Sequence, residues 1–389
     1  MKKAIVVGSG ISGCTCARAL AENDYEVTVI EKLNHVGGNV YDELIDDIYV
    51  HMYGPHIFHT NDENVYKFLS KFTEWFPYEH KVLANIYGNY VPVPFNLTSL
   101  EKLYMKNKVE KIKKILIDEY GFGNKVPVMQ LKQHKDKDIQ EFGNFVLNKI
   151  FIHYTQKQWG RKIEELDPNV MQRVPVYISY EDKYFTDKFQ CQPKLGFTQL
   201  INNMLNHKNI KILKNVDAND VLELKDGKIF YKNQEFNGKV IFTGAVDEFC
   251  NYKFGELPYR SLDFKFKKTK KSQLQPCAVV NYTVNKKYTR ISEFKKFTTY
   301  KAPEKGSIYI KEYPLEFKRD KGLIRYYPIV NEKSTDIFNK YKKYLSNYLN
   351  FYVLGRLGDY KYINMDIAVK NALDLANDII EGDISKWTY

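Results

Sequence analysis

The strand, glycine turn and helix encoded at the start of the chain restrict its fold more than any other feature. Residues 4–7 (AIVV) predict a short buried strand, three glycines follow in G-x-G-x-x-G spacing, and residues 11–23 predict a helix. A second predicted strand, residues 26–31 (EVTVIE), ends at an acidic residue. This order of elements predicts a Rossmann-like unit that binds an adenine dinucleotide.

Each residue of this fingerprint has a physical task. Gly8 permits a tight turn, Gly10 lets the backbone approach a pyrophosphate, and Gly13 lets the helix pack closely on the strand. The start of the helix, where Ser12 lies, offers free N–H groups and a partial positive charge to phosphates. Glu31 can accept hydrogen bonds from both ribose hydroxyls and would repel a 2′-phosphate.

A second glycine pair favours FAD over NAD as the expected cofactor. The stretch HVGGN (35–39) follows the ribose-binding acid and resembles the extended fingerprint of flavoproteins related to glutathione reductase and the amine oxidases. In those proteins the Gly-Gly backbone passes close to the pyrophosphate and the ribityl chain. Lys32, Gly38 and Asn39 therefore join the expected FAD contacts, and an ordinary Gly-Gly turn is the alternative.

Three of the eight histidines lie close together around the stretch GPHIFHTND (54–62). Thr60 and Glu63 fit a capping box with Thr60 as the N-cap, so His56 and His59 lie in the connection that enters a helix. On an extended connection their spacing turns the two side chains to opposite sides. We therefore expect no shared metal, and His51 does not repair the geometry.

The remaining pattern predicts an α/β (α+β) fold with a discontinuous nucleotide domain. Residues 101–170 are typical of helices, several strand-like segments follow, and the chain ends in a strand, a glycine turn and a long helix that begins near Asp366. The predicted division is a Rossmann-like FAD-binding domain from residues 1–62, 190–250 and 350–389, a mainly helical substrate and dimerisation domain from 63–160, and an antiparallel β-sheet domain from 161–189 and 251–349.

Composition narrows the partners and the compartment. The five cysteines lack paired metal-type spacing, which favours free thiols in a reducing cytoplasm. The net charge of +12 favours anionic ligands, but no nucleic-acid motif accompanies it, and no stretch approaches the ~20 apolar residues of a membrane span. The 31 tyrosines suggest a ring-shaped or polyhydroxylated ligand. We therefore expect no nucleic-acid partner and no membrane span.

Several longer motifs resemble one enzyme family in particular. The stretches GPHIFHT, YTQKQWG, RVPVYISYEDKYF, YTRI, KEYP, YYP and GRLGDYKYINMD occur in the order found in bacterial UDP-galactopyranose mutases. The resemblance implies interconversion of UDP-galactopyranose and UDP-galactofuranose, in which N5 of reduced FAD serves as the nucleophile. It also implies a homodimer that supplies galactofuranose for surface polysaccharide such as capsule.

The resemblance assigns substrate contacts residue by residue. Arg173 and Arg290 match the two diphosphate-binding arginines, and a mobile loop near 165–180 would carry Arg173 inward. The hydroxyls of Tyr184, Tyr326 and Tyr362 would reach the diphosphate. The expected uridine pocket and its mobile-loop neighbour comprise Phe151, Tyr154, Thr155 and Trp159. Asn281 matches another position that contacts the substrate.

The flavin end of the cofactor has its own expected contacts. These are His56, Ile57, Arg356, Gly358, Ile363, Asn364, Met365 and Asp366. His56 is the expected flavin neighbour, His59 would line the sugar side, either could transfer protons, and His51 is assigned to structure. His80 and Asn364 depart from the family pattern, in which an Asn and an Asp are common. The preference between galactose and N-acetylgalactosamine stays open.

Two other functions compete with this interpretation. A flavin amine-oxidase-like oxidoreductase would share the FAD fingerprint, would work with oxidised flavin and would need no UDP. A non-catalytic protein that binds nucleotides or polyanions would show no turnover and strongly salt-dependent binding. YTQKQWG and the paired arginines argue against the oxidase. The sequence identifies neither the oligomeric state nor the reductant of the flavin.

Overall fold

The N-terminal fingerprint folds into the strand–turn–helix unit that the sequence predicts. The computed structural model describes residues 2–160, 175–284 and 286–387. In it β1 (Lys2–Val7) leads through the glycine turn into α1 (Ile11–Ala21), and β2 (Tyr25–Glu31) follows. β1 pairs in parallel with β2 on one side and with β16 (Lys239–Phe242) on the other. The predicted Rossmann-like unit is confirmed.

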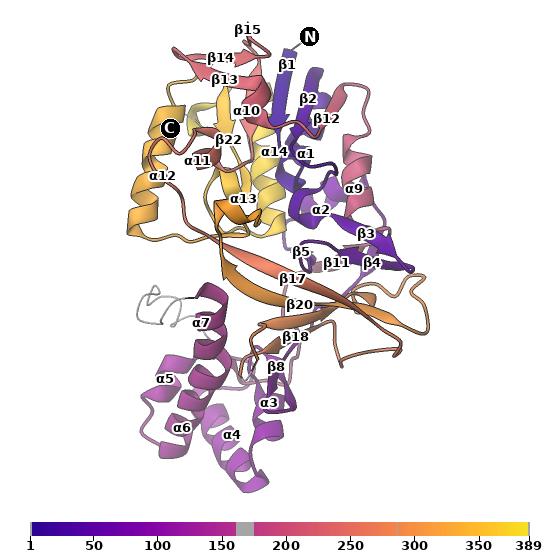
Figure 1. Ribbon diagram of the computed structural model, residues 1–389. Coiled ribbons are helices and arrows are strands. Elements are labelled where there is room, and N and C mark those ends of the chain that lie inside the picture. Colours follow the sequence, from indigo (N-terminus) through magenta and orange to yellow (C-terminus); the bar gives the residue numbers. More distant parts are fainter. Residues whose placement is uncertain (1, 161–174, 285, 388–389) are drawn as a thin grey trace.

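The parallel sheet draws strands from three distant parts of the chain. Its order is β12-β2-β1-β16-β22, with β12 at Ile210–Lys214 and β22 at Phe351–Val353. The side chains of β1 alternate between two cores, one on each face of the sheet. Ala4 and Val6 pack in the core that contains α1, α9 (Gly196–Leu205) and α14 (Met365–Glu381). Ile5 and Val7 pack in the core that contains α11 (Val246–Phe249) and α12 (Glu332–Leu345). Figure 1 shows this layered upper part of the molecule, with both termini in it.

A second, long sheet crosses the molecule below the first (Figure 1). Its order is β21-β17-β20-β19-β18-β7-β8. The bounds are β7 Val82–Ile86, β8 Asn89–Val93, β17 Tyr259–Thr269, β18 Val279–Tyr282, β19 Arg290–Glu293, β20 Ser307–Glu316 and β21 Tyr327–Pro328. The sheet differs from the prediction in two ways. The β18–β7 pair is parallel, and β7 and β8 come from the segment expected to be mainly helical.

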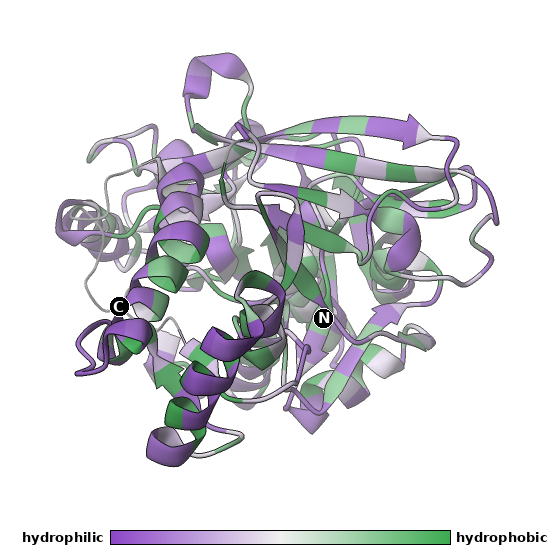
Figure 2. Ribbon diagram, turned by 90° about the horizontal axis from the view of Figure 1, so that it is seen from below, coloured by the Kyte–Doolittle hydropathy of each residue, from purple (hydrophilic) through white to green (hydrophobic). Residues whose placement is uncertain are grey.

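A group of helices lies below the long sheet in the view of Figure 1 and has its own hydrophobic core. It consists of α3 (Leu97–Leu103), α4 (Lys106–Tyr120), α5 (Val128–Lys132), α6 (Lys137–Phe145), the π-helical segment η2 (Val146–Ile152) and α7 (His153–Trp159), with β9 (Lys125–Pro127) paired to β10 (Pro175–Tyr177). Figure 2 shows helices with hydrophilic residues along one side and hydrophobic residues along the other. In α4, Val109, Ile112 and Leu116 form the buried side.

Short sheets complete the fold and correct one local prediction. They pair β3 (Asp42–Ile45) with β4 (Ile48–His51), β5 (Phe58–Thr60) and β6 (Trp75–Pro77) with β11 (Phe189–Pro193), and β13 (Leu222–Lys225) and β15 (Gln234–Glu235) with β14 (Lys228–Tyr231). The expected Thr60 cap is wrong: Thr60 ends β5, and the Asp62 carboxylate caps α2 (Glu63–Ser70) by accepting from the amides of Asn64 and Val65. A carboxylate directly before the helix reaches both amides, which Thr60 cannot do from within a strand.

The remaining short elements are α10 (Ala218–Val221), α13 (Gly355–Gly358) and the 3₁₀ turns η1 (Gly38–Val40), η4 (Phe294–Lys296), η5 (Arg319–Lys321) and η6 (Ser385–Trp387). Among the described residues, no helix combines the length and the apolar character that crossing a membrane requires.

Candidate active site

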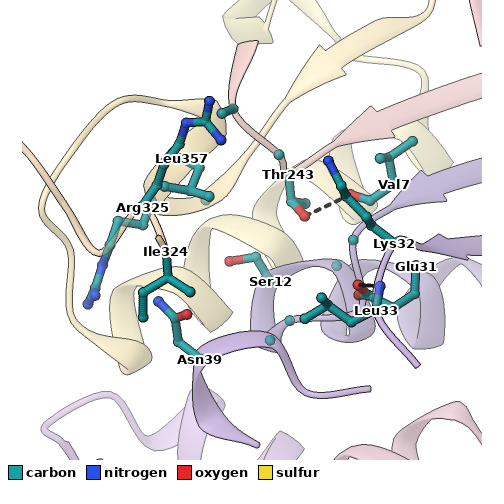
Figure 3. Close-up of a pocket in the computed structure, with 18 of the residues that line it drawn as sticks. Val7, Ser12, Glu31, Lys32, Leu33, Asn39, Thr243, Ile324, Arg325 and Leu357 are labelled. Atoms are coloured by element: carbon teal, nitrogen blue, oxygen red, sulfur yellow. Dashed lines mark hydrogen bonds between the residues drawn. The ribbon is translucent and has the colours of Figure 1, made fainter. Parts of the chain in front are cut away.

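A cleft of about 620 Å³ lies at the carboxyl ends of the parallel strands. Its lining comes from the N-terminal fingerprint, from residues 216–219 and 242–249, and from residues 355–368 near the C-terminus. Figure 3 shows Ser12, Glu31 and Thr243 around the same hollow, with Ile324 and Asn39 facing each other at one side. Volume and position at the strand ends are typical of a nucleotide site in an open α/β sheet.

Two glycines of the fingerprint permit the close packing that forms the floor of the cleft. A Cβ added to Gly13 would lie 2.0 Å from the carbonyl oxygen of Gly8, and a Cβ on Gly8 would lie 2.2 Å from Oγ1 of Thr243. Thr243 is itself fixed, because its hydroxyl donates to the carbonyl of Val7 at 2.7 Å. Only glycine fits at these two positions.

Glu31 provides the acceptor expected for a ribose. Its Oε2 accepts from the Ser9 amide at 2.8 Å and from the Ser9 hydroxyl at 2.5 Å, and its Oε1 accepts from the Leu33 amide at 2.8 Å. Oε1, with one donor, has further acceptor capacity for a ribose hydroxyl, whereas Oε2 already accepts two hydrogen bonds. The neighbouring amides at the start of α1 line the same cleft, so the residues present fit an adenine dinucleotide without a 2′-phosphate.

Most of the expected cofactor residues line this cleft. They are Gly8, Gly10, Ser12, Gly13, Glu31, Lys32, Gly38, Asn39, His56, Arg356, Ile363, Asn364 and Met365. Ile57, Gly358 and Asp366 do not line it. Sequence reasoning missed the loop between β20 and β21, from which Arg319, Ile324 and Arg325 line the cleft. No short motif in that loop could have revealed its position.

His56 and His51 together form what we call the histidine wall, in which His56 lines the cleft and His51 is buried behind it. His56 lines the cleft, and its Nδ1 lies 2.9 Å from the carbonyl oxygen of Gly54, which requires a hydrogen on Nδ1. The amide of His56 donates to Nδ1 of the buried His51 at 2.9 Å. Burial first, and then neighbouring charge, lowers the pKa of His51 to about 3 and that of His56 to about 4, so both rings are neutral.

His59 and His80 belong to a separate group beside this wall. His59 stacks on Phe185 with 3.6 Å between ring centroids, and its Nδ1 lies 3.0 Å from a carboxylate oxygen of Asp187. His80 packs against Tyr184 and Phe185, and burial, followed by the charge of Arg290, lowers its pKa to about 3. Within the described ranges no group of three or more His, Cys, Asp or Glu side chains is placed to hold a metal ion.

Arg290 forms an ion pair that the sequence did not reveal. Arg290 on β19 faces Glu312 on β20 as a cross-strand pair, with Nε and Oε1 2.6 Å apart. Burial lowers the pKa of the Arg290 guanidinium, but the charge and hydrogen bond of Glu312, which is 1% exposed, act together with Tyr154 and Tyr327 and leave that pKa raised. In the described part of the chain Arg290 makes its hydrogen bond through Nε, so both Nη groups stay available to a ligand.

Tyrosines surround this arginine and face open space. Burial raises the pKa of the Tyr154 hydroxyl while the nearby charge of Arg290 opposes the rise. Tyr184 and Tyr362 are 41% and 57% exposed, so they border an open space rather than a core. The guanidinium of Arg356 lies 5.2 Å from the ring centre of Tyr362, which connects this group to the cleft.

Tyr326 is placed differently from the expectation. It is 2% exposed, and its hydroxyl donates to the carbonyl of Tyr53 at 2.8 Å, so that hydroxyl fixes the backbone before the histidine wall. The adjacent Tyr327 lies 5.3 Å from the ring of Tyr362 and near Arg356. Neighbouring residues of a strand point to opposite sides, so the pair YYP alone does not reveal which tyrosine faces the site.

The expected uridine residues lie on η2 and α7, and the further substrate contact Asn281 lies on β18. Phe151 is half-buried in η2, and Thr155 on α7 is 4% exposed. Asn281 on β18 is the cross-strand partner of Arg290, and among the described residues its buried Oδ1 has no hydrogen-bond partner. Trp159 is the last residue of α7, whereas Arg173 and residues 165–174 of the predicted mobile loop lie outside the described residues.

The end of α7 shows why a glycine follows the tryptophan. Gly160 has φ +63°, and a Cβ there would lie 2.6 Å from Nη1 of Arg260. Nε of Arg260, on β17, donates to the carbonyl of Gln158 at 3.0 Å. A cation from the long sheet thus holds the carboxyl end of the helix that contains Tyr154.

Comparisons with known proteins agree with this geometry. The model of the UDP-galactopyranose mutase family matches residues 149–362, and that of an NAD(P)-binding Rossmann-like domain matches residues 6–72. The chain is 35% identical to a dTDP-fucopyranose mutase of Escherichia coli, with 98% of this chain and 100% of the relative covered. It is also 35% identical to a probable UDP-galactopyranose mutase of Klebsiella pneumoniae, with 97% and 95% covered.

Solved structures add support for the fold. A crystal structure of reduced UDP-galactopyranose mutase matches with a TM-score of 0.70 at 13% identity, covering 98% of this chain and 96% of that one. A putative protoporphyrinogen oxidase from Exiguobacterium sp. 255-15 matches with a TM-score of 0.62 at 12% identity, covering 98% of this chain and 99% of that one. Fold alone does not separate mutases from oxidases, but the family model and the relatives do. The chain belongs to the UDP-galactopyranose mutase family of flavin-dependent enzymes.

Proposed function

We propose that the protein interconverts the pyranose and furanose forms of a nucleoside-diphosphate galactose, UDP-galactose above all, with FAD in its reduced state as cofactor. The proposal rests chiefly on the Arg290–Glu312 pair, in which Glu312 is buried and the Arg290 side chain is 21% exposed. The pair lies in the stretch that matches the mutase family and is surrounded by tyrosines that connect to the cleft through Arg356. This arrangement suits a diphosphate held beside a flavin.

The chain would hold FAD along the whole cleft. The amides at the start of α1 and the glycine turn would bind the pyrophosphate, and Glu31 would bind the adenosine ribose. Arg356 and the residues from Ile363 to Met365 would contact the flavin end. When bound and reduced, FAD would supply a nucleophilic N5 toward the anomeric carbon of the sugar.

Arg290 would carry the main electrostatic task. Interconversion requires the bond between the anomeric carbon and the diphosphate oxygen to break, after which the sugar closes through a different hydroxyl and the bond forms again. The departing UDP takes the bonding electron pair, and the Arg290 guanidinium, whose Nη groups have no hydrogen-bond partner among the described residues, would stabilise that charge. We propose that Arg173 acts with Arg290, and that Tyr184, Tyr327 and Tyr362 orient the diphosphate.

The histidine wall would work as a neutral surface. Because Nδ1 of His56 bears the hydrogen, its Nε2 bears the lone pair and can accept a hydrogen bond from cofactor or sugar. His59, held by Asp187, would support the sugar side. With a neutral wall, the positive charge that attracts the diphosphate would come from arginines such as Arg290 and Arg356.

A second substrate is favoured by one comparison. The relative named dTDP-fucopyranose mutase is as similar to this chain as the Klebsiella relative, at 35% identity. A dTDP-bound 6-deoxy sugar is therefore the alternative substrate, and the N-acetylgalactosamine form of the UDP sugar is the third. All three share the diphosphate and the ring-contraction chemistry, so the same residues would serve each of them.

The test is a chromatographic assay of the purified, FAD-loaded protein with each of the three nucleotide sugars in the furanose form. We expect conversion to the pyranose form with dithionite and none without it. If only dTDP-fucose or only the N-acetyl sugar is converted, the substrate assignment changes but the proposed chemistry stands. Failure to convert any of them under reducing conditions would refute the proposal, and peroxide production with an amine would favour an oxidase.

We propose as well that the enzyme works in the cytoplasm as a homodimer and supplies furanose donors for surface polysaccharide such as capsule. This extension rests on the family resemblance. Size-exclusion chromatography with light scattering tests the dimer, and loss of furanose from the cell surface after deletion tests the pathway.

A further inference from the structure

Lys157 of the YTQKQWG stretch has no role in the function proposed above, yet it has an unusual set of partners. Its ammonium donates to the main-chain carbonyls of Tyr282, Lys286 and Tyr288, the last two at 3.1 and 3.5 Å. Tyr282 is the last residue of β18, and Lys286 and Tyr288 lie in the turn that leads from it to β19. Within the described residues Lys157 has no carboxylate partner, so its three donors are used to hold backbone.

That turn directly supports two residues of the diphosphate site. The amide of Tyr282 donates to the carbonyl of Thr289 at 2.8 Å, and the next pair along the hairpin is Asn281 opposite Arg290. The Lys157 ammonium therefore holds the residue that directly follows Asn281, and Asn281 pairs across the hairpin with Arg290. Displacement of the turn would displace the guanidinium.

Lys157 belongs to helix α7, which also contains Tyr154, an expected uridine residue. Lys157 follows Tyr154 by one helical turn of α7, so both side chains lie on the same face of the helix. Tyr154 and Arg290 are within electrostatic reach of each other, which shows that this face and the hairpin border one space. Burial lowers the pKa of Lys157 to about 8, so the charged form still predominates at neutral pH.

We propose that Lys157 is a positioning residue that locks the nucleoside-binding helix α7 to the β18–β19 hairpin, so that uracil and diphosphate are bound at a fixed separation. A nucleoside diphosphate would gain from the lock because both of its ends bind without reorganisation of the protein. A nucleoside alone, which would contact η2 and α7 but not the hairpin, would gain little. The inference deepens the proposed function and rests on it for the identity of the ligand.

The lock itself is tested on the ligand-free holoenzyme by hydrogen–deuterium exchange. Lys157→Met retains the aliphatic stem and removes the ammonium, and Lys157→Arg retains a charge. Lys287→Met is the matched control, because it removes an exposed positive charge from the same turn. We expect the amides of Tyr282 and Thr289 to exchange about tenfold faster in Lys157→Met, with partial recovery in Lys157→Arg and no change in the control. Unchanged exchange in Lys157→Met would overturn the proposal.

The consequence for binding is tested by calorimetry with uridine and with UDP. We expect Lys157→Met to weaken UDP binding about tenfold and uridine binding less than about threefold, with flavin content unchanged. Proportional weakening of both ligands would mean general damage and would refute the coupling. If the wild-type protein binds neither UDP nor dTDP, the proposed function fails, whereas the exchange experiment still decides whether the lock exists.

Discussion

The neutral histidines of the histidine wall lead to a quantitative prediction about the stability of the protein in acid. The pKa of His51 falls from its ordinary 6.5 to about 3 in the folded protein, mainly through burial. A group with a lowered folded pKa leaves stability intact above its unfolded pKa and costs stability as the pH falls toward the folded value. Since His51 stays neutral when folded and binds a proton when unfolded, the cost grows as the pH falls from 6.5 and reaches its full size near pH 3.

The size of this cost at a chosen pH follows from the unfolded pKa alone. At about pH 5 each such histidine lowers the free energy of unfolding by about 2 kcal/mol relative to neutral pH. His56 and His80, with pKa values lowered to about 4 and about 3, add similar amounts. Asp359 works in the opposite direction, because burial raises its pKa to about 6. Comparison of single variants separates these contributions.

His51→Asn provides the test, because the Asn Oδ1 can replace Nδ1 as acceptor for the His56 amide without titrating. Urea unfolding of the FAD-loaded protein would be followed by circular dichroism at about pH 7.5 and about pH 5. We expect the variant to be less stable at neutral pH, because a ring is lost from the core, but to lose about 2 kcal/mol less than wild type on acidification. His153→Asn, at an exposed position, should follow wild type. Parallel losses in wild type and His51→Asn would refute the reasoning.

Three further changes test other parts of the site. Glu312→Gln leaves the partly buried Arg290 charge without its counter-charge, so we expect a loss of about 3 kcal/mol and a UDP-induced rise in melting temperature larger than that of wild type, because the diphosphate then replaces the carboxylate. Asp359→Asn should be more stable than wild type by up to about 3 kcal/mol above pH 6 in chemical unfolding, with the gap closing toward pH 3.8, because a raised folded pKa costs stability as the pH rises through that window. Gly160→Ala should lower UDP affinity in calorimetry without loss of flavin, because its Cβ displaces Arg260 from the end of α7; unchanged affinity would contradict that role.

The nucleotide half of the molecule could be predicted because its signals are local. The glycines, the strand before them and Glu31 lie within one supersecondary unit, so spacing alone predicts which atoms meet. The capping residue of α2 was missed because two candidate caps, Thr60 and Asp62, precede the same helix and the end of β5 decides between them.

The substrate half depends on register and on contacts between distant segments. Glu312 meets Arg290 because β19 and β20 pair in one particular register, which no local pattern reveals. Asp187 reaches His59 across two paired strands, β5 and β11. The resemblance predicts roles for Arg290 and Tyr362 but says nothing of the partners that hold them, because packing between distant segments determines those partners.

The most direct test of the account follows the bond between the sugar and the diphosphate. UDP-galactopyranose labelled with heavy oxygen at the bridge between the anomeric carbon and the β-phosphorus would be incubated with the dithionite-reduced, FAD-loaded protein and examined by phosphorus NMR. We predict that the label moves to non-bridging positions of the β-phosphate, and that Arg290→Ala slows this movement at least about 100-fold while flavin remains bound. A label that stays in the bridge while furanose product forms would contradict departure of UDP, and with it the role assigned to Arg290.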